Sequence, residues 1–428
     1  MQKVAIISLG CKVNQYESES IAKKLVDAGR VVEFGLCVAD VYVLNTCAVT
    51  NEAERKSRGL IAKVKKLNPD AKIYICGCSA QNNKDSFLKF KNVVAVYGTG
   101  RKMDIADLII EKYSGEQLVC QTITSEYEDR YFPLPSHTRA YMKIQDGCNN
   151  FCSYCIIPYL RGRSRSRELE SVKNELESLA KKTKEIVLTG INLSAYGQDL
   201  QPKKSLADVA KLFLNVPVRF RFSSLEVNVI DEDFLRLLKS LPNFCDHFHL
   251  SMQSGCDETL KFMNRHYTVA TFLNKIALIR KYFPHAGITT DVIVGFPTES
   301  EADFEETYKT CVKARFADMH IFPYSPRRNT VALNFKTVAS NIPERVKKLT
   351  ELKLKMKENF IFSCLGSVFD CLVEGKKSAS GLYEGHTKNF IKCYIKTKEP
   401  LMQNSIVNVK LVDFYEDGAL AEIVNDES

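Results

Sequence analysis

Three closely spaced cysteines are the most chemically distinctive feature of the sequence. Cys148, Cys152 and Cys155 lie in the segment GCNNFCSYC with the spacing C-x3-C-x2-C. Thiolates are soft ligands that select iron–sulfur clusters, zinc or Cu(I). A cubane cluster takes one thiolate on each of four irons, so three cysteines leave one iron open to a small molecule. The spacing therefore predicts a reactive cluster site.

The alternative for this trio is a zinc site that is completed from elsewhere in the chain. A zinc knuckle usually supplies its second pair of ligands nearby. After Cys155, however, the next cysteine or histidine is Cys245. The iron–sulfur cluster is therefore the favoured interpretation.

A second set of cysteines follows predicted strands in the first part of the chain. Cys11, Cys47 and Cys78 each come just past the carboxyl end of a short apolar β-run, at residues 4–8, 41–44 and 73–75. In an open parallel sheet these ends border the crevice where ligands bind. The pattern predicts a second cluster with an open iron. Three unrelated buried cysteines are the alternative, and Cys76 competes with Cys78 for the third position.

Both sets of cysteines lie in segments that resemble known motifs. The C-x3-C-x2-C loop, with Tyr154 before its third cysteine, resembles the cluster loop of radical S-adenosylmethionine (SAM) enzymes. The segments SLGCKVNQ, NTCAVT and GCSAQ around the N-terminal cysteines resemble the three cluster motifs of the methylthiotransferase family. The resemblance covers essentially the whole chain. It implies two [4Fe–4S] clusters, held by Cys148, Cys152 and Cys155 and by Cys11, Cys47 and Cys78.

The same resemblance implies a SAM site beside the first of these clusters. The open iron would be chelated by SAM, with Tyr154 near its adenine. Residues at the ends of further strands hold the rest of SAM in radical SAM enzymes, and the matching positions here are Gly190, Gln253 and Gly295. A glycine or polar residue that ends a strand is more often simple turn chemistry, so that alternative stays open.

Four arginines follow the cluster loop at every second position. If this segment is extended, all four guanidinium groups share one face, which suits phosphate or carboxylate. A solvated run of charge is the alternative. Because the segment follows the cluster loop directly, we expect substrate-binding roles for Arg161, Arg163, Arg165 and Arg167.

The elements that must position these residues fall into three folded parts. Residues 1–120 alternate strands and helices, which predicts a doubly wound parallel α/β domain. After a polar linker at residues 121–138, residues 139–342 contain six strand–helix units, which predicts a partial barrel whose active site lies at the carboxyl ends of the strands. A helix at residues 343–362 leads to five short strands at residues 363–428, which predict a small β-barrel. This last part resembles the RNA-binding TRAM domain that ends methylthiotransferases.

Composition limits the possible binding partners and the cellular location of the protein. Lys plus Arg exceeds Asp plus Glu by nine in 428 residues, which permits a polyanionic partner. The chain contains 15 cysteines, and its start lacks the features of a signal peptide. No apolar stretch approaches the length that spans a bilayer. We therefore expect no membrane association and a cytoplasmic location with reduced thiols.

Within the family, the segments GCKVNQY and RGRSRSR look most like the branch that modifies N6-threonylcarbamoyladenosine at position 37 of tRNA. The implied reaction replaces the adenine C2–H with a methylthio group and uses two SAM molecules per turnover. The chemistry is carried by the clusters and no residue is expected as an acid or base. The implied partners are the tRNA anticodon loop and an electron donor such as flavodoxin or ferredoxin. Alternatives are isopentenylated adenosine in tRNA, a ribosomal-protein aspartate as substrate, and a non-catalytic iron–sulfur protein.

Overall fold

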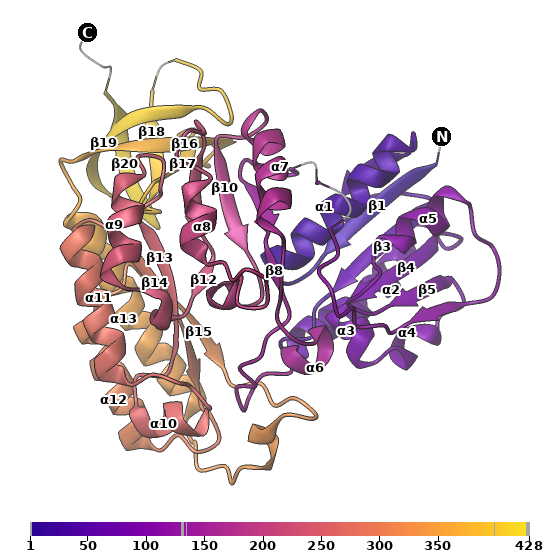
Figure 1. Cartoon of the computed structure of the whole chain (residues 1–428), viewed down its shortest axis with the longest axis horizontal. Coiled ribbons are helices and arrows are strands. Elements are labelled where there is room, and N and C mark those ends of the chain that lie inside the picture. The colour runs from indigo at the N-terminus through magenta and orange to yellow at the C-terminus, as the bar shows by residue number, and fades with distance from the viewer. Residues whose placement is uncertain (1, 130–131, 134, 398, 425–428) are drawn as a thin grey trace.

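The computed structural model describes residues 2–129, 132–133, 135–397 and 399–424. Figure 1 shows the chain running from an N-terminal α/β part, through a central array of strands and helices, to a small C-terminal barrel. Among the described residues, no helix is long and apolar enough to cross a membrane. The predicted fold class is confirmed.

The N-terminal part is a six-stranded parallel sheet in the order β2-β1-β3-β4-β5-β6. Buried side chains form one hydrophobic core on each face, as a doubly wound sheet requires. The strands are β1 (Lys3–Ser8), β2 (Val31–Phe34), β3 (Val41–Thr46), β4 (Lys72–Gly77), β5 (Val93–Tyr97) and β6 (Leu118–Cys120). The helices are α1 (Lys12–Asp27), α2 (Asn51–Leu67), α3 (Cys78–Asn82), α4 (Asp85–Leu88) and α5 (Asp104–Ile110).

The central part contains two parallel sheets, with the strand orders β11-β10-β7 and β12-β13-β14-β15. The main strands are β7 (Ala140–Lys143), β10 (Glu185–Thr189), β11 (Arg219–Phe222), β13 (His247–Gln253), β14 (Gly287–Val294) and β15 (Asp318–Pro323). Three further strands have two residues each: β12 (Ser224–Leu225) in the second sheet, and β8 (Gln145–Asp146) and β9 (Arg165–Ser166), which pair with each other. Within the described ranges, β15 does not pair with β7, so the predicted partial barrel remains open.

Helices cover the outside of the partial barrel (Figure 1). Alternate strand residues such as Phe220, Phe222, Phe248 and Leu250 pack against them in one large core. The helices are α6 (Ile157–Arg161), α7 (Leu169–Ala180), α8 (Leu206–Lys211), α9 (Glu232–Ser240), α10 (Asp257–Phe262), α11 (Val269–Tyr282) and α12 (Glu301–Ala314). Short 3-10 turns are η1 (Leu193–Ala195), η2 (Val227–Val229) and η3 (Val331–Asn334).

Helix α13 (Ile342–Phe362) leads into a closed barrel in the order β16-β17-β18-β20-β19. Its strands are β16 (Val368–Lys377), β17 (Tyr383–Thr387), β18 (Lys392–Lys396), β19 (Ile406–Tyr415) and β20 (Gly418–Ile423). This barrel packs at the amino ends of the central strands, where the ring of Phe390 lies 4.7 Å from that of His247. The opposite, carboxyl ends are therefore left to the cysteine loop.

Candidate active site between two cysteine triads

The loop with the C-x3-C-x2-C motif follows β8 and is held by its backbone. Gly147 has φ +69°, and a Cβ there would lie 1.9 Å from the carbonyl oxygen of Arg163. The N–H of Cys148 donates to the carbonyl of Gly162 at 3.0 Å, and that of Cys155 donates to Cys152 at 2.9 Å. Only glycine tolerates this positive φ together with such a close approach. The loop is thereby closed back on the residues that follow α6.

The thiols of this loop lie close together and receive N–H donors. Burial, followed by the nearby Cys152, raises the pKa of the Cys155 thiol to about 12. The side chain of Asn192 donates to Cys148 Sγ at 3.8 Å, and Arg265 donates to Cys152 Sγ at 3.4 Å. Donors of this kind orient the sulfur atoms that would bind a metal. We call Cys148, Cys152 and Cys155 the barrel triad.

The three N-terminal cysteines also meet, at the carboxyl edge of their sheet. Cys11 precedes α1, Cys47 follows β3 directly, and Cys78 is the first residue of α3. Burial, followed by the nearby Cys78, raises the pKa of Cys47 to about 12. Gly10 has φ +99°, and a Cβ there would lie 2.7 Å from Cys47 Sγ, so the strand end must be glycine for the thiols to approach. We call Cys11, Cys47 and Cys78 the N-terminal triad.

Cys76, the competitor of Cys78, lies within β4 and is fully buried. It packs in the hydrophobic core with Val43 and Ala95. Among the described residues, no group of three His, Cys, Asp or Glu side chains could hold a single metal ion. A cubane cluster does not require the three side chains to converge on one ion, because each thiolate binds a separate iron. The two all-sulfur donor sets fit iron–sulfur clusters in their chemistry.

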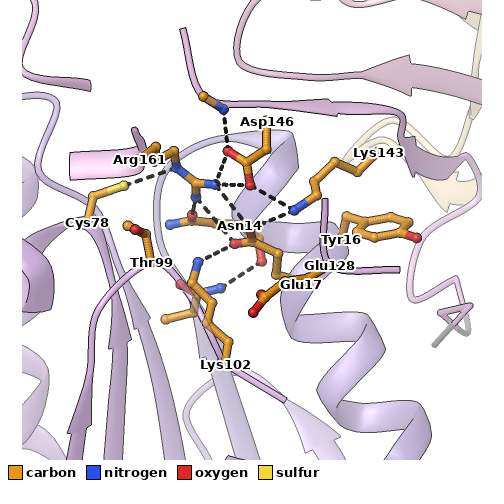
Figure 2. Close-up of polar contacts among 12 residues, drawn as sticks. Asn14, Tyr16, Glu17, Cys78, Thr99, Lys102, Glu128, Lys143, Asp146 and Arg161 are labelled. Atoms are coloured by element: carbon orange, nitrogen blue, oxygen red, sulfur yellow. Dashed lines mark hydrogen bonds and ion pairs between the residues drawn. The ribbon is translucent and has the colours of Figure 1, made fainter. Parts of the chain in front are cut away.

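A buried network of charges connects the surroundings of the two triads, with Arg161 at its centre (Figure 2). Arg161 is 0% exposed, and its Nη1 lies 3.0 Å from both Glu17 and Asp146. Its Nη2 donates to Asn14 at 2.7 Å, and its Nε donates to Cys78 Sγ at 3.4 Å. One guanidinium therefore contacts α1, β8 and a cysteine of the N-terminal triad.

The network holds more positive than negative charge. The carboxylates of Glu17 and Asp146 are surrounded by four cations: Lys102, Lys143, Arg161 and Arg165. Burial raises the pKa of Glu17, but the positive charge of Arg161 and then of Lys102 outweighs it, so the pKa lies well below its usual range. Both carboxylates are therefore ionised. This positive charge lies beside Cys78, whose sulfur accepts a hydrogen bond from Arg161.

The network also fixes the two cysteine loops to each other. Ile156, which directly precedes α6, and Leu160, within α6, pack with Ala48 and Cys78 from the N-terminal sheet edge. The hydroxyl of Thr99 donates to the carbonyl of Leu160 at 2.6 Å. Since α6 begins two residues after Cys155, these contacts hold the two triads at one shared boundary.

The expectation that four arginines share one face is wrong. Arg161 ends a helix instead of an extended segment, and it is buried in the network. Arg165 donates to the carbonyl of Arg161 at 2.6 Å, and Arg167 pairs with Glu175 on α7 and with Asp129 at 2.9 Å. Arg163 differs, because it is exposed and its guanidinium lies 4.6 Å from the ring centre of Phe151. Arg161, Arg165 and Arg167 are buried and each pairs with a carboxylate, so Arg163 alone of the four is exposed.

The positions expected to bind SAM lie at the carboxyl ends of the strands. Tyr154 packs with Met263 and Phe296. Gln253 ends β13 with φ +67°, and a Cβ on Gly190 would lie 2.9 Å from the side chain of Gln145. The N–H of Gly295 donates to Glu299 at 2.7 Å. Their roles toward SAM stay predictions.

Sequence reasoning missed Asn192 and Arg265. Asn192 lies two residues past Gly190, so the search for candidate residues after strand ends could have found it. Arg265 lies between α10 and α11, outside every motif, and only the fold brings it to Cys152. Its ion pair with Glu226 at 3.1 Å orients it there.

An open barrel with a cysteine loop at its carboxyl end defines the class of radical SAM enzymes. Residues 142–311 match the Radical SAM superfamily, and residues 3–98 match the family described as Uncharacterized protein family UPF0004. The structure is similar to that of the radical SAM methyltransferase TsrM from Kitasatospora setae, with a TM-score of 0.53, 14% identity and coverage of 86% of this chain and 77% of that one. That likeness concerns the fold alone.

Relatives with similarity over the full length narrow the class. The threonylcarbamoyladenosine tRNA methylthiotransferase MtaB of Bacillus subtilis is 34% identical over 100% of this chain and 98% of its own length. Its counterpart from Thermotoga maritima is 41% identical over 84% of this chain and 82% of its own. The tRNA-2-methylthio-N(6)-dimethylallyladenosine synthase of Clostridium tetani is 33% identical over 94% and 92%. The chain therefore belongs to the radical SAM methylthiotransferase family, enzymes that use SAM and a [4Fe–4S] cluster.

Proposed function

We propose that this enzyme converts N6-threonylcarbamoyladenosine at position 37 of tRNA to its 2-methylthio derivative. The observation that carries the proposal is the contact between α6 and the N-terminal sheet edge, which places two cysteine triads at one boundary. Relatives that bear the name of this activity are 34–41% identical over 84–100% of this chain. The adenosine belongs to an anticodon loop, where unpaired bases can be turned into a pocket.

In this proposal each triad holds its own [4Fe–4S] cluster. When bound, the two clusters and two SAM molecules per turnover supply the hydrogen-abstracting radical, the sulfur and the methyl group. Cys148, Cys152 and Cys155 hold the cluster that binds SAM, beside Tyr154, Gly190, Gln253 and Gly295. Cys11, Cys47 and Cys78 would hold the second cluster, which would supply the sulfur.

The chain's own side chains position and protect these groups. Arg161 donates to Cys78 Sγ and Arg265 donates to Cys152 Sγ, so each arginine holds one cysteine sulfur in position. The buried network around Glu17 fixes the N-terminal part against β8, which keeps the two triads in register. Substrate RNA meets the exposed Arg163, while the closed C-terminal barrel supplies a TRAM-like RNA-binding surface. A flavodoxin or ferredoxin as electron donor and a cytoplasmic location suit this chemistry.

Mass spectrometry of nucleosides from the tRNA of a strain that lacks the gene tests the proposal. We expect 2-methylthio-N6-threonylcarbamoyladenosine to disappear while its unthiolated precursor accumulates. Loss of methylthiolated isopentenyladenosine instead would assign the activity of the dimethylallyladenosine synthases. An unchanged nucleoside profile would refute both.

A further inference from the structure

A cavity of about 380 Å³, lined by both apolar and charged side chains, lies inside the open barrel. Its walls come from the inward residues of β11, β13, β14 and β15, and Phe390 of the C-terminal barrel closes it at the amino ends of the strands. Lys12 also lines the cavity and is exposed. Because Lys12 directly follows Cys11, the cavity opens next to the N-terminal triad. A cavity of this volume accepts a group of nucleoside size.

Arg221 on β11 is the feature of this cavity that calls for a ligand. It is only 3% exposed, and its Nε donates to Glu185 at 2.8 Å. Its Nη1 and Nη2 are both buried without a hydrogen-bond partner. The guanidinium lies 4.5 Å from the ring centre of Phe390, so the ring covers one face and leaves the N–H edge available. Buried donors without acceptors are costly, and a charged one especially so.

Several charged groups surround Arg221. Glu185 is shared among Arg139, Arg219 and Arg221, and Glu374 pairs with Arg139 at 2.6 Å. Asp246 also lies close enough to interact with the charge of Arg221. His247, beside them, has a buried Nδ1 without a partner. Among the described residues none of these carboxylates bonds to the terminal nitrogens of Arg221, so this end of the cavity offers unused donors.

The acidic residues that line the cavity have partners of their own. Asp291 bonds with His249 at 3.1 Å and lies 3.4 Å from His320. Asp318 pairs with Lys353 at 3.2 Å and with Lys357 at 3.4 Å, and Asp417 pairs with Lys392 at 3.0 Å. Lys12 experiences the charge of Asp291, although the two make no ion pair within 4.0 Å among the contacts described. The open positions in the cavity are therefore donors rather than acceptors.

We propose that this cavity is a carboxylate-binding pocket for the N6 substituent of the target adenine, with Arg221 binding the threonyl carboxylate and Lys12 adding positive charge at the opening. This inference rests on the proposed function. A planar carboxylate can accept from both terminal nitrogens of one guanidinium. An isopentenyl group offers no acceptor and would leave Arg221 and His247 unpaired. Arg221 is thus a residue that determines specificity.

Binding of anticodon stem–loops to the reconstituted full-length chain tests the pocket. Fluorescence anisotropy would compare three RNAs that differ only at position 37: the threonylcarbamoyl form, its carboxyl methyl ester, and unmodified adenosine. We expect the wild-type chain to prefer the free acid over the ester by roughly tenfold or more, as for a charge-assisted hydrogen bond in a buried site. Equal affinity of the wild-type chain for acid and ester would overturn the inference.

Variants identify the residues responsible. Arg221→Met should bind acid and ester equally while its affinity for the unmodified RNA stays at the wild-type value, and Arg221→Lys should keep part of the preference. Lys12→Met provides a second reading if Arg221→Met does not fold, and it too should reduce the preference. Lys63→Met, at an exposed position of α2, is its matched control and should leave the preference unchanged. A full preference in Arg221→Met, or in Lys12→Met where Arg221→Met is unfolded, would contradict the assignment.

The product separates failure of the pocket from failure of the proposed function. If the wild-type enzyme methylthiolates threonylcarbamoyladenosine but does not distinguish acid from ester, the pocket is wrong and the function stands. If it methylthiolates only isopentenyladenosine, the proposed function fails, and the pocket fails with it.

Discussion

Replacing Arg161 with methionine tests whether the buried network holds the two cysteine loops together. The change removes a fully buried guanidinium with two ion pairs at 3.0 Å and hydrogen bonds to Asn14 and Cys78. Breaking a buried ion pair by removing one partner costs about 3–5 kcal/mol. Because lysines still pair with both carboxylates, we expect the lower end, about 3 kcal/mol.

Hydrogen–deuterium exchange of the α6 amides measures this cost locally. The N–H groups of Leu160 and Gly162 are bonded within the helix, so they exchange only when α6 opens. A loss of about 3 kcal/mol corresponds to roughly hundredfold faster exchange, since 1.4 kcal/mol is a factor of ten. The matched control is Arg236→Met on α9, whose guanidinium is exposed and pairs with surface carboxylates. That variant should leave the exchange of α6 unchanged.

The result that would refute this reasoning is equal exchange of α6 in the two variants. Arg161 would then be a passive part of the boundary, and the fixed relation between the triads would need another cause. Arg161→Lys refines the outcome. It keeps the positive charge but cannot contact Glu17, Asn14 and Cys78 at once, so it should exchange at an intermediate rate.

Three further outcomes follow from the same structure. Gly10→Ala would place a Cβ 2.7 Å from Cys47 Sγ and should lower the amount of iron bound by the N-terminal triad. Gly35→Ala is the control, because Gly35 has a similar φ of +100° but open space around it, and it should leave the bound iron unchanged. Iron analysis after reconstitution compares the two variants. In Gly147→Ala the new Cβ would lie 1.9 Å from the carbonyl oxygen of Arg163, so reductive SAM cleavage, measured as 5′-deoxyadenosine, should be abolished. A variant that cleaves SAM normally would show that the loop can move. Burial, followed by the charge of Arg221, lowers the pKa of His247 well below 6.5, so below pH 6.5 the unfolded chain binds one more proton than the folded chain. Stability should then fall with falling pH by up to about 1.4 kcal/mol per pH unit, and denaturant titrations of His247→Gln should show a shallower slope.

The sequence predicts the placement of the cysteines because strand topology determines it. Once β1, β3 and β4 are parallel neighbours, the residues after their carboxyl ends must share one edge of the sheet. The central strands and the small C-terminal barrel were predictable for another reason: short β-runs recur along the chain, separated by helices in the central part and by turn residues in the last part. Edge strands β2 and β6 were missed, because β2 is mostly exposed and lacks a clear alternating pattern.

The side-chain network was beyond prediction from local pattern. Alternating arginines suggested an extended segment, but Pro158 at the start of α6 and the bonds of Arg161 favour a helix there. The ion-pair partners of Arg161 are Glu17, 144 residues away in the sequence, and Asp146, 15 residues away. Arg265 likewise reaches Cys152 across 113 residues. Such partners depend on how the N-terminal part packs on the barrel, and no local spacing encodes that packing.

Separate removal of the two cysteine triads measures the central claim most directly. One variant replaces Cys11, Cys47 and Cys78 with alanine, and the other replaces Cys148, Cys152 and Cys155. After anaerobic reconstitution, each is given SAM, reductant and tRNA that carries threonylcarbamoyladenosine. We predict that the first variant still forms 5′-deoxyadenosine but no methylthiolated nucleoside, and that the second forms neither. Methylthiolated product from the first variant would contradict the account, because sulfur would then reach the adenine without the N-terminal triad.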